Sequence, residues 1–204
     1  MHLIGATSLG VTIVLLLAAL VIVKQIATGA ILDRPQGSLL VQLVNVFNLF
    51  FLLIVNPLAA VGLLLGRLEP LDPTHVEVQA GGLLVTLEIA GLVIYVAGFA
   101  LMGWALLTLR RNYQLGGSAP RAGDRMVVDG PYALIRHPMY SAALAIALGL
   151  ACLLQSLAFL AVFVIYLALI VPLISTEERG LEAAYGAQYA QYRKHTRKLV
   201  PAIY

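Results

Sequence analysis

The eleven residues from Gly130 to Tyr140 hold two prolines, two tyrosines, an arginine and a histidine. Such side chains are unsuited to a helix that faces lipid, but they suit a shaped binding pocket. Aromatic faces attract a cation, and Arg136 or His137 would bind a carboxylate. We therefore predict a pocket at this stretch.

A second polar group, Glu177 and Glu178, should lie beside the first. Two apolar segments, 139–154 and 157–174, separate the two groups and are joined only by Gln155 and Ser156. This pattern predicts a tight helical hairpin, which leaves one face and returns to it. Tyr140 and Glu177 should then meet, and carboxylates there would bind ribose hydroxyls or an amine. A zwitterionic nucleoside with a positive centre would suit the combined site.

Other chemistries find less support in the sequence. No H-x-x-E or E-x-x-H unit is present, and His137 and the two glutamates lack close metal-ligand spacing, so we predict no metal site. Glycine-rich dinucleotide, phosphate-loop and serine-elbow motifs are also absent. The net charge of +3 is explained by membrane topology and does not indicate nucleic-acid binding.

The composition places these residues in a bilayer. Of 204 residues, 61% are hydrophobic and 11% are charged, against roughly 45–50% and about 25% in soluble domains. Five apolar segments have a length near the ~20 residues that a spanning helix needs. They are residues 3–23, 39–65, 81–107, 139–154 and 157–174.

We therefore predict an all-α membrane protein with about five transmembrane helices, forming one integral membrane domain over 1–204. Residues 1–107 would supply three spans, and 108–204 the binding loop, the hairpin and a C-terminal amphipathic helix. The alternative for 3–23 is a cleavable signal peptide, but its basic n-region is missing and the first lysine is Lys24.

Polar residues inside the expected spans can be interpreted in two ways, as structural or as functional groups. Asn45, Asn48 and Asn56 fall near one helical face, with Pro57 expected to kink the helix. They either bond neighbouring helices or line a substrate cleft. Glu88 is either a structural partner, which we expect near Asn56, or a proton-handling group.

A separate amphipathic helix is predicted for the C-terminal stretch from Ser175 onward, with Ser175 or Thr176 capping its start. On a helix, Glu177 shares a side with Leu181, Tyr185 and Tyr192, while Glu178 points elsewhere.

Orientation follows from the basic residues. Twelve of the 13 Lys and Arg residues fall in the 24–38 loop, the 110–138 loop or the C-terminal stretch. In a five-span topology these lie on one side, which the positive-inside rule makes cytoplasmic, with the N-terminus outside.

Together these residues carry a resemblance over about 95–204. Gly130-Pro131-Tyr132, Arg136-His137-Pro138-Met139-Tyr140 and Glu177-Glu178, with Tyr185-Gly186, Tyr189, Tyr192 and Pro201, resemble the isoprenylcysteine carboxyl methyltransferase and phospholipid methyltransferase superfamily. The resemblance implies an integral membrane enzyme that uses S-adenosylmethionine to methylate a lipophilic, membrane-embedded acceptor. By position, it assigns cofactor contacts to Asp124, Arg125, Met126, Val127, Tyr132, His137, Pro138, Met139, Tyr140 and Glu177.

One position departs from the isoprenylcysteine enzymes, which place an arginine four residues before the first glutamate. Here that residue is Leu173, which argues against a prenylcysteine carboxylate and leaves phospholipid or isoprenoid acceptors open. An amine or hydroxyl acceptor would need a base, for which Glu178 and Glu88 are the candidates.

Three rival hypotheses remain at this point. Membrane sterol reductases, which use NADPH, are similar in the C-terminal half. A non-enzymatic transporter or assembly protein is the second rival. In the third, the motif is only a structural turn at a helix start, with Arg136 bound to lipid phosphate.

Overall fold

The computed structural model describes residues 4–32, 38–67, 72–76, 78, 81–114, 120–121 and 123–200. Within these ranges the chain is helical and contains no strand, which confirms the all-α prediction. The elements are α1 (Ala6–Thr28), α2 (Leu39–Phe50), η1 (Phe51–Val55), α3 (Asn56–Leu64), α5 (Gly82–Leu109), η2 (Arg110–Asn112), η3 (Gly130–Ala133), α6 (Pro138–Leu154), α7 (Leu157–Tyr185) and α8 (Ala187–His195).

Four helical rods are long and apolar enough to cross a membrane: α1, the rod Leu39–Leu64, α5 with its extension to Asn112, and α7. The remaining expected span is α6, which is apolar but has only 17 residues. At 1.5 Å per residue it is about 25 Å long, a little less than the ~30 Å hydrocarbon core. Most predicted ends agree closely, but α1 runs five residues beyond its expected end and α7 runs eleven residues beyond.

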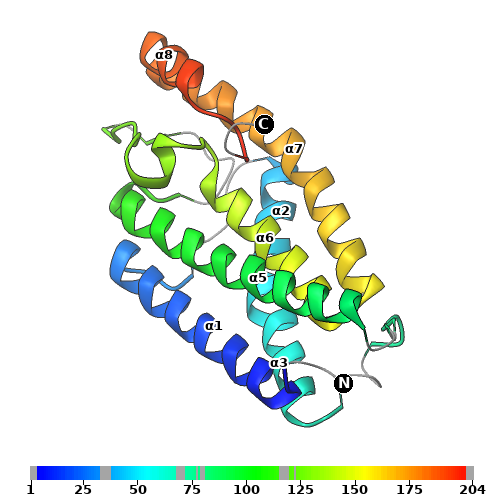
Figure 1. The fold of residues 1–204 in the computed structure, drawn as a ribbon. Helices are drawn as coiled ribbons and strands as arrows, with labels where there is room; N and C mark the ends of the chain where they lie inside the picture. The colour runs from blue at the N-terminus through cyan, green and yellow to red at the C-terminus, as the bar shows by residue number, and fades with distance from the viewer. Residues whose placement is uncertain are drawn as a thin grey trace.

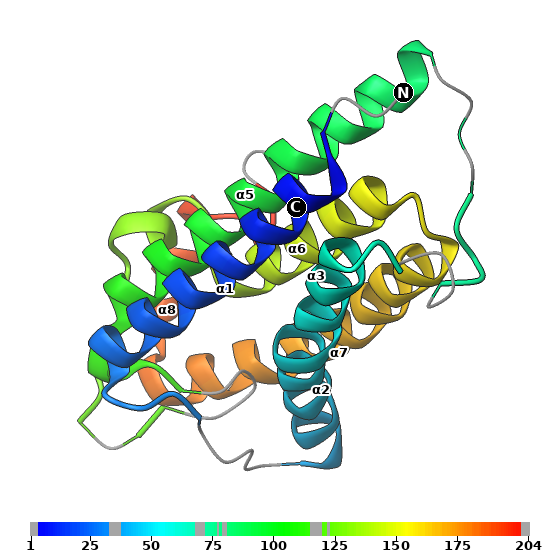
Figure 2. The same ribbon diagram turned by 90° about the horizontal axis from the view of Figure 1, so that it is seen from below.

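The arrangement of the helices gives the molecule two distinct ends. α1, α5 and α6 lie side by side, and the α2–α3 rod crosses them steeply (Figures 1 and 2). The end of α5 and all of α8 lie at one end, while the N-terminus and the tip of the α6–α7 hairpin lie at the other (Figure 1). The site residues predicted in the C-terminal half lie toward the α8 end.

The α2–α3 rod changes its hydrogen-bond spacing just before Pro57. Proline has no N–H to donate, so a regular ladder cannot continue through it. The backbone N–H of Asn56 instead bonds to the carbonyl of Phe51, five residues back, and residues 51–55 form a π-helical turn. The disruption expected at Pro57 takes this form.

Glycines bring α5 and α6 into close contact. A Cβ added to Gly149 would lie 2.6 Å from the backbone nitrogen of Tyr95, and one added to Gly98 would lie 2.9 Å from that of Ile146. Small residues allow helix backbones to approach in this way inside membranes. The α5–α6 pair therefore forms a rigid base for the turn that precedes α6.

The prediction of a separate helix from Ser175 is wrong, because α7 continues without a break to Tyr185. The two hydroxyls expected to cap a new helix point back along the existing one. Ser175 donates to the carbonyl of Val171, and Thr176 donates to that of Pro172. Only the last part of the stretch, α8, is a separate helix, after Gly186.

The expected pairing of Asn56 with Glu88 is also wrong. Asn56 accepts a 2.6 Å hydrogen bond from the Tyr95 hydroxyl. Glu88 is buried near the start of α5, where its carboxylate accepts from the backbone N–H of Ile4 at 3.4 Å. Glu88 thus lies at the hairpin-tip end of the molecule, away from α8.

Replacing Gly149 with alanine should destabilise the protein. Its new Cβ would meet backbone atoms of α5, and overpacking of this kind costs roughly 1–3 kcal/mol. Gly103→Ala is the matched control, since its Cβ would meet only Val23 Cγ1 at an ordinary 3.8 Å. Thermal unfolding in detergent, followed by circular dichroism, should give a lower Tm for Gly149→Ala and an unchanged or higher Tm for Gly103→Ala. A Gly149→Ala protein as stable as wild type would contradict the close α5–α6 packing.

Candidate functional site

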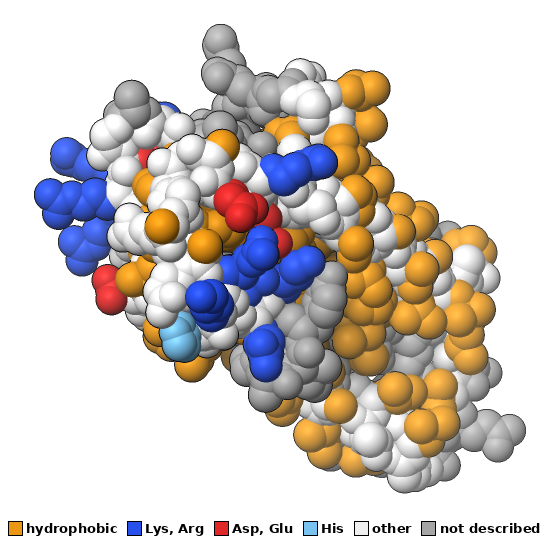
Figure 3. All heavy atoms as spheres, turned by 90° about the horizontal axis from the view of Figure 1, so that it is seen from above, with side chains coloured by type: hydrophobic (Ala, Val, Ile, Leu, Met, Phe, Trp, Pro, Cys, Tyr) orange, Lys and Arg blue, Asp and Glu red, His pale blue; other side chains and the backbone are white. Residues whose placement is uncertain are grey.

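A cavity of about 270 Å³ lies among the ends of α1, α2, α5, α6, α7 and α8. All ten residues that the sequence analysis assigned to the cofactor line it: Asp124, Arg125, Met126, Val127, Tyr132, His137, Pro138, Met139, Tyr140 and Glu177. The structure therefore brings Glu177 together with the segment 124–140, which ends 37 residues earlier in the sequence. Figure 3 shows charged side chains gathered over the α8 end, beside a flank covered by hydrophobic ones.

The start of the motif is shaped by Gly130. Its φ of +58° is one that residues with side chains rarely adopt, and a Cβ would lie 2.7 Å from Thr108 Oγ1 and 3.1 Å from Trp104 Nε1. The chain can therefore turn tightly against α5 only with glycine here. Pro138 follows at the first position of α6, where a missing N–H is tolerated.

The C-terminal segment holds this turn in place through its backbone. The N–H of Arg136 donates to the carbonyl of Arg197 at 2.7 Å, and that of His137 donates to the carbonyl of Lys198 at 3.0 Å. The hydroxyl of Ser141 donates to the carbonyl of Leu199 at 2.6 Å. Residues 197–199 thus run alongside the motif and fix its position.

Glu177 and Glu178 have different roles in the structure, as their helical positions predicted. Glu177 lines the cavity and accepts a 2.7 Å hydrogen bond from the Tyr140 hydroxyl, 37 residues earlier. The imidazole of His137 stacks on the Tyr140 ring, with 5.7 Å between centroids. The predicted meeting of Tyr140 and Glu177 is confirmed.

Glu178 forms a buried ion pair instead. Its Oε1 lies 2.8 Å from Arg136 Nε and 3.4 Å from His137 Nε2, and the side chains of Arg136 and Glu178 are only 6% and 10% exposed. Arg136 also donates to the carbonyl of Thr196. This arrangement ties the motif, α7 and the C-terminal segment to one another.

Neither base candidate reaches the cavity. Glu178 does not line it, and its carboxylate is held by a guanidinium, which makes it a poor proton acceptor. Glu88 does not line it either. The geometry therefore supports proton transfer by neither residue.

The loop before the motif folds over the cavity and is held by Asp124. The Asp124 carboxylate accepts from Gln114 Nε2 at 2.7 Å and from the backbone N–H of Arg121 at 3.0 Å. The Tyr185 hydroxyl, from the end of α7, donates to the Asp124 carbonyl at 3.3 Å. Asp124 thus positions the loop, while Arg125, Met126 and Val127 follow it along the wall.

Tyrosines supply much of the wall, and sequence reasoning assigned only two of them to the site. The others are Tyr113, Tyr166, Tyr185, Tyr189 and Tyr192. The helical stripe that contains Glu177 was the signal for Tyr185 and Tyr192. Burial raises the pKa of Tyr192 to about 12, so its hydroxyl stays protonated and donates to the Tyr132 carbonyl at 2.7 Å. Burial, with the nearby Glu177 carboxylate, raises the pKa of Tyr132 far above its usual range.

The first half of the chain supplies the rest of the cavity. We call its hydrophobic lining from α1 and the α2–α3 rod the apolar wall. It consists of Leu17, Leu20, Val21, Leu49, Leu52 and Leu53. Asn45 and Asn48 also line the cavity, whereas Asn56 does not. Asn45 and Asn48 therefore fit the interpretation that these residues line a cleft, whereas Asn56 fits the interpretation that they bond neighbouring helices.

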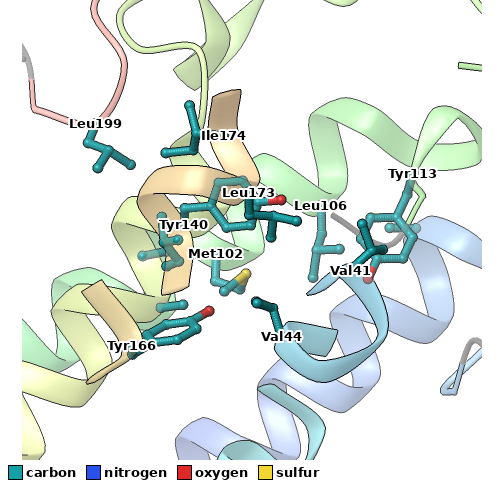
Figure 4. Packing of buried hydrophobic residues seen from close by; sticks show 14 residues of the cluster. Val41, Val44, Met102, Leu106, Tyr113, Tyr140, Tyr166, Leu173, Ile174 and Leu199 are labelled. Atoms are coloured by element: carbon teal, nitrogen blue, oxygen red, sulfur yellow. The ribbon is translucent and has the colours of Figure 1, made fainter. Parts of the chain in front are cut away.

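Leu173 lies outside the cavity, and its side chain is fully buried. Figure 4 shows it within the apolar cluster, among Tyr140, Met102 and Leu106. Among the residues that the structure describes, no group of three or more His, Cys, Asp or Glu side chains is placed to hold a metal ion.

Comparison with known proteins agrees with this architecture. Residues 86–188, half of the chain, match the model of the phospholipid methyltransferase family. The chain belongs to this family. The matched segment contains α6, the motif and all ten predicted cofactor contacts, but it excludes α1 and the α2–α3 rod.

One curated relative is the cobalt-zinc-cadmium resistance protein CzcN of Cupriavidus metallidurans (strain ATCC 43123 / DSM 2839 / NBRC 102507 / CH34). The two sequences are 35% identical over 104 residues, which cover 50% of this chain and 48% of the relative. The match thus spans about half the length of that protein.

Among solved structures, the chain is similar to the eukaryotic intramembrane Ras methyltransferase ICMT (isoprenylcysteine carboxyl methyltransferase). The TM-score is 0.54 at 20% identity, covering 80% of this chain and 74% of the other. At this level of identity the likeness shows a shared fold. The family match confirms the phospholipid methyltransferase resemblance, and the four long apolar rods support an integral membrane protein.

Removing one partner of the Arg136–Glu178 pair should destabilise the protein strongly. Arg136→Gln would leave a buried carboxylate without its guanidinium, a change that typically costs about 3–5 kcal/mol. In Arg136→Gln/Glu178→Gln neither charge remains, so we expect much of the loss to be recovered. Thermal unfolding of the two variants in detergent tests this, and a double variant less stable than the single one would contradict the pairing.

Proposed function

We propose that this protein is an S-adenosylmethionine-dependent methyltransferase that acts on a lipophilic acceptor in the membrane. The observation that supports this best is the composition of the cavity described above. One part is lined by carboxylate, imidazole and phenol groups from the family-matched segment, and another part is the apolar wall. Such a cavity suits a polar cofactor on one side and a hydrocarbon body on the other.

The residues present fit the cofactor. Glu177 would accept from ribose hydroxyls or the amino group, and Arg125 would meet the carboxylate. The rings of Tyr132 and Tyr140 offer faces to a positively charged sulfonium. When bound, S-adenosylmethionine supplies an electrophilic methyl group whose transfer leaves a neutral thioether.

The chain's own contribution would be to hold and orient the reactants. Tyr140 and His137 fix the Glu177 carboxylate on the cavity wall, and the loop anchored by Asp124 covers the site. Excluding water and holding two reactants in an attack geometry together contribute as much as roughly 7–11 kcal/mol in favourable cases. The mechanism needs no residue to become covalently modified.

The acceptor is proposed to be a phospholipid-like or isoprenoid molecule, and not a prenylcysteine carboxylate. The buried Leu173 offers no cation to the cavity. A free carboxylate would therefore lose the guanidinium partner that the isoprenylcysteine enzymes supply at this position.

Binding of the reaction product S-adenosylhomocysteine provides the decisive test. Calorimetry of the purified protein should detect it, and should detect no NADPH binding; the opposite result would favour a reductase. Glu177→Gln should weaken S-adenosylhomocysteine binding at least tenfold, because a charge-assisted hydrogen bond is worth about 1.5–3 kcal/mol. Glu182→Gln is the matched control, since Glu182 lies on the same helix but is half-exposed on the surface beside Arg193.

We further propose that the α8 end faces the cytoplasm and the N-terminus lies outside. The bias of basic residues toward this end supports that orientation. In a protein whose Cys152 is replaced by serine, Lys194→Cys should react with an impermeant maleimide only after the cells are permeabilised. Arg67→Cys, at the end of the α2–α3 rod, should react in intact cells. The reverse pattern would overturn the orientation.

A further inference from the structure

Two asparagines of the α2–α3 rod accept hydrogen bonds from tyrosines, and they differ in what else they bind. Asn56 accepts from the Tyr95 hydroxyl at 2.6 Å, and its Nδ2 donates to the Phe51 carbonyl at 2.8 Å. It is fully buried and lies outside the cavity. Both ends of its amide are used, so Asn56 serves to hold the rod against α5.

Asn48 has the same type of partner but a different environment. Its Oδ1 accepts from the hydroxyl of Tyr166, whose ring packs 5.3 Å from that of Phe47. Within the described part of the chain, no group accepts from its Nδ2. Asn48 is half-buried and lines the cavity. Because Tyr166 occupies the amide oxygen, the two N–H groups of Nδ2 are the end left for a ligand.

The position of Asn48 connects the two parts of the cavity. One residue later, Leu49 belongs to the apolar wall. Toward the predicted cofactor contacts, Asn48 is bonded to Tyr166, which belongs to the same buried cluster as Tyr140 (Figure 4). Tyr140 in turn donates to Glu177. Asn48 therefore lies between the hydrocarbon surface and the cofactor contacts, where the head of a lipophilic acceptor would have to lie.

The same region is outside the family match, which begins at residue 86. The family segment supplies the cofactor side, whereas the acceptor side is built from α1 and the α2–α3 rod. Acceptor specificity in this protein should therefore depend on residues that the family model does not describe.

We propose that Asn48, oriented by Tyr166, recognises the head group of the methyl acceptor. Its Nδ2 donates to a hydrogen-bond-accepting oxygen, such as a carbonyl, ester or phosphate oxygen, while the hydrocarbon body lies against the apolar wall. The proposal rests on the proposed methyltransferase function and names the substrate class of that site: a lipid or isoprenoid whose head carries such an oxygen.

The test uses a double variant, Asn48→Leu/Tyr166→Phe. Removing both partners avoids leaving the Tyr166 hydroxyl buried without an acceptor, which Asn48→Leu alone would do. The full-length protein is reconstituted in vesicles of total lipid extract from its expression host and supplied with methyl-tritiated S-adenosylmethionine. The label that enters the organic phase measures transfer, and calorimetry with S-adenosylhomocysteine measures the cofactor side.

We expect the double variant to bind S-adenosylhomocysteine within twofold of wild type but to transfer label about tenfold more slowly, as the loss of one hydrogen bond predicts. A second pair of variants tests the apolar wall. Leu49→Trp would fill the cavity and should reduce transfer with cofactor affinity unchanged. Val46→Trp, on the exposed side of the same helix and outside the cavity, should leave both unchanged.

The outcomes separate the two proposals. A wild-type protein that fails to bind S-adenosylhomocysteine overturns the proposed function. A wild type that binds and transfers, together with a double variant that transfers at the wild-type rate, overturns only the role of Asn48. Mass spectrometry of the labelled lipid distinguishes phosphate-bearing from phosphate-free acceptors, and a head group without an accepting oxygen would also overturn that role.

Discussion

The ion pair between Arg136 and Glu178 connects the parts of the molecule on which the cavity depends. A guanidinium and a carboxylate shielded from water at the end of an apolar bundle are costly unless each has a partner. Here the carboxylate is met by Arg136 and approached by His137, and the guanidinium also reaches the Thr196 carbonyl. The motif, α7 and the C-terminal segment are thereby held together. Because Glu178 is directed toward Arg136, the preceding residue, Glu177, is directed toward the cavity.

Much of this could be predicted from the sequence, because the decisive signals are local or periodic. Apolar runs predicted the helices and the hairpin, and the hairpin predicted that Tyr140 and Glu177 meet. A rotation of 100° per residue separated the orientation of Glu177 from that of Glu178. The motif then identified a set of wall residues that all line one cavity.

The predictions that are wrong concern which side chains pair and whether a helix ends or continues at a given residue. Equal depth in a bilayer suggested Asn56 and Glu88 as partners, but the depth was misjudged. Tyr95 lies seven residues after Glu88, on nearly the same face of α5 but about 10 Å farther along its axis, and its hydroxyl is the one that reaches Asn56. Similarly, a residue such as Ser175 caps the start of a new helix only if the preceding helix ends before it. The α7 backbone ladder continues, and the hydroxyl bonds back to Val171.

Tyrosine is the residue that makes a polar cavity compatible with an apolar bundle. Its ring packs like a hydrocarbon, while its single hydroxyl demands one specific partner. Tyr95, Tyr140 and Tyr166 each donate to a side chain on another helix. Such bonds between distant segments determine the packing register in a way that non-directional contacts cannot. They also orient the partner: an amide or carboxylate held at one oxygen presents its remaining polar atoms in a known direction. At Asn48 the Nδ2 end is directed to the cavity, and Glu177 is held on the cavity wall by Tyr140; this is why we assign ligand contacts to these two residues.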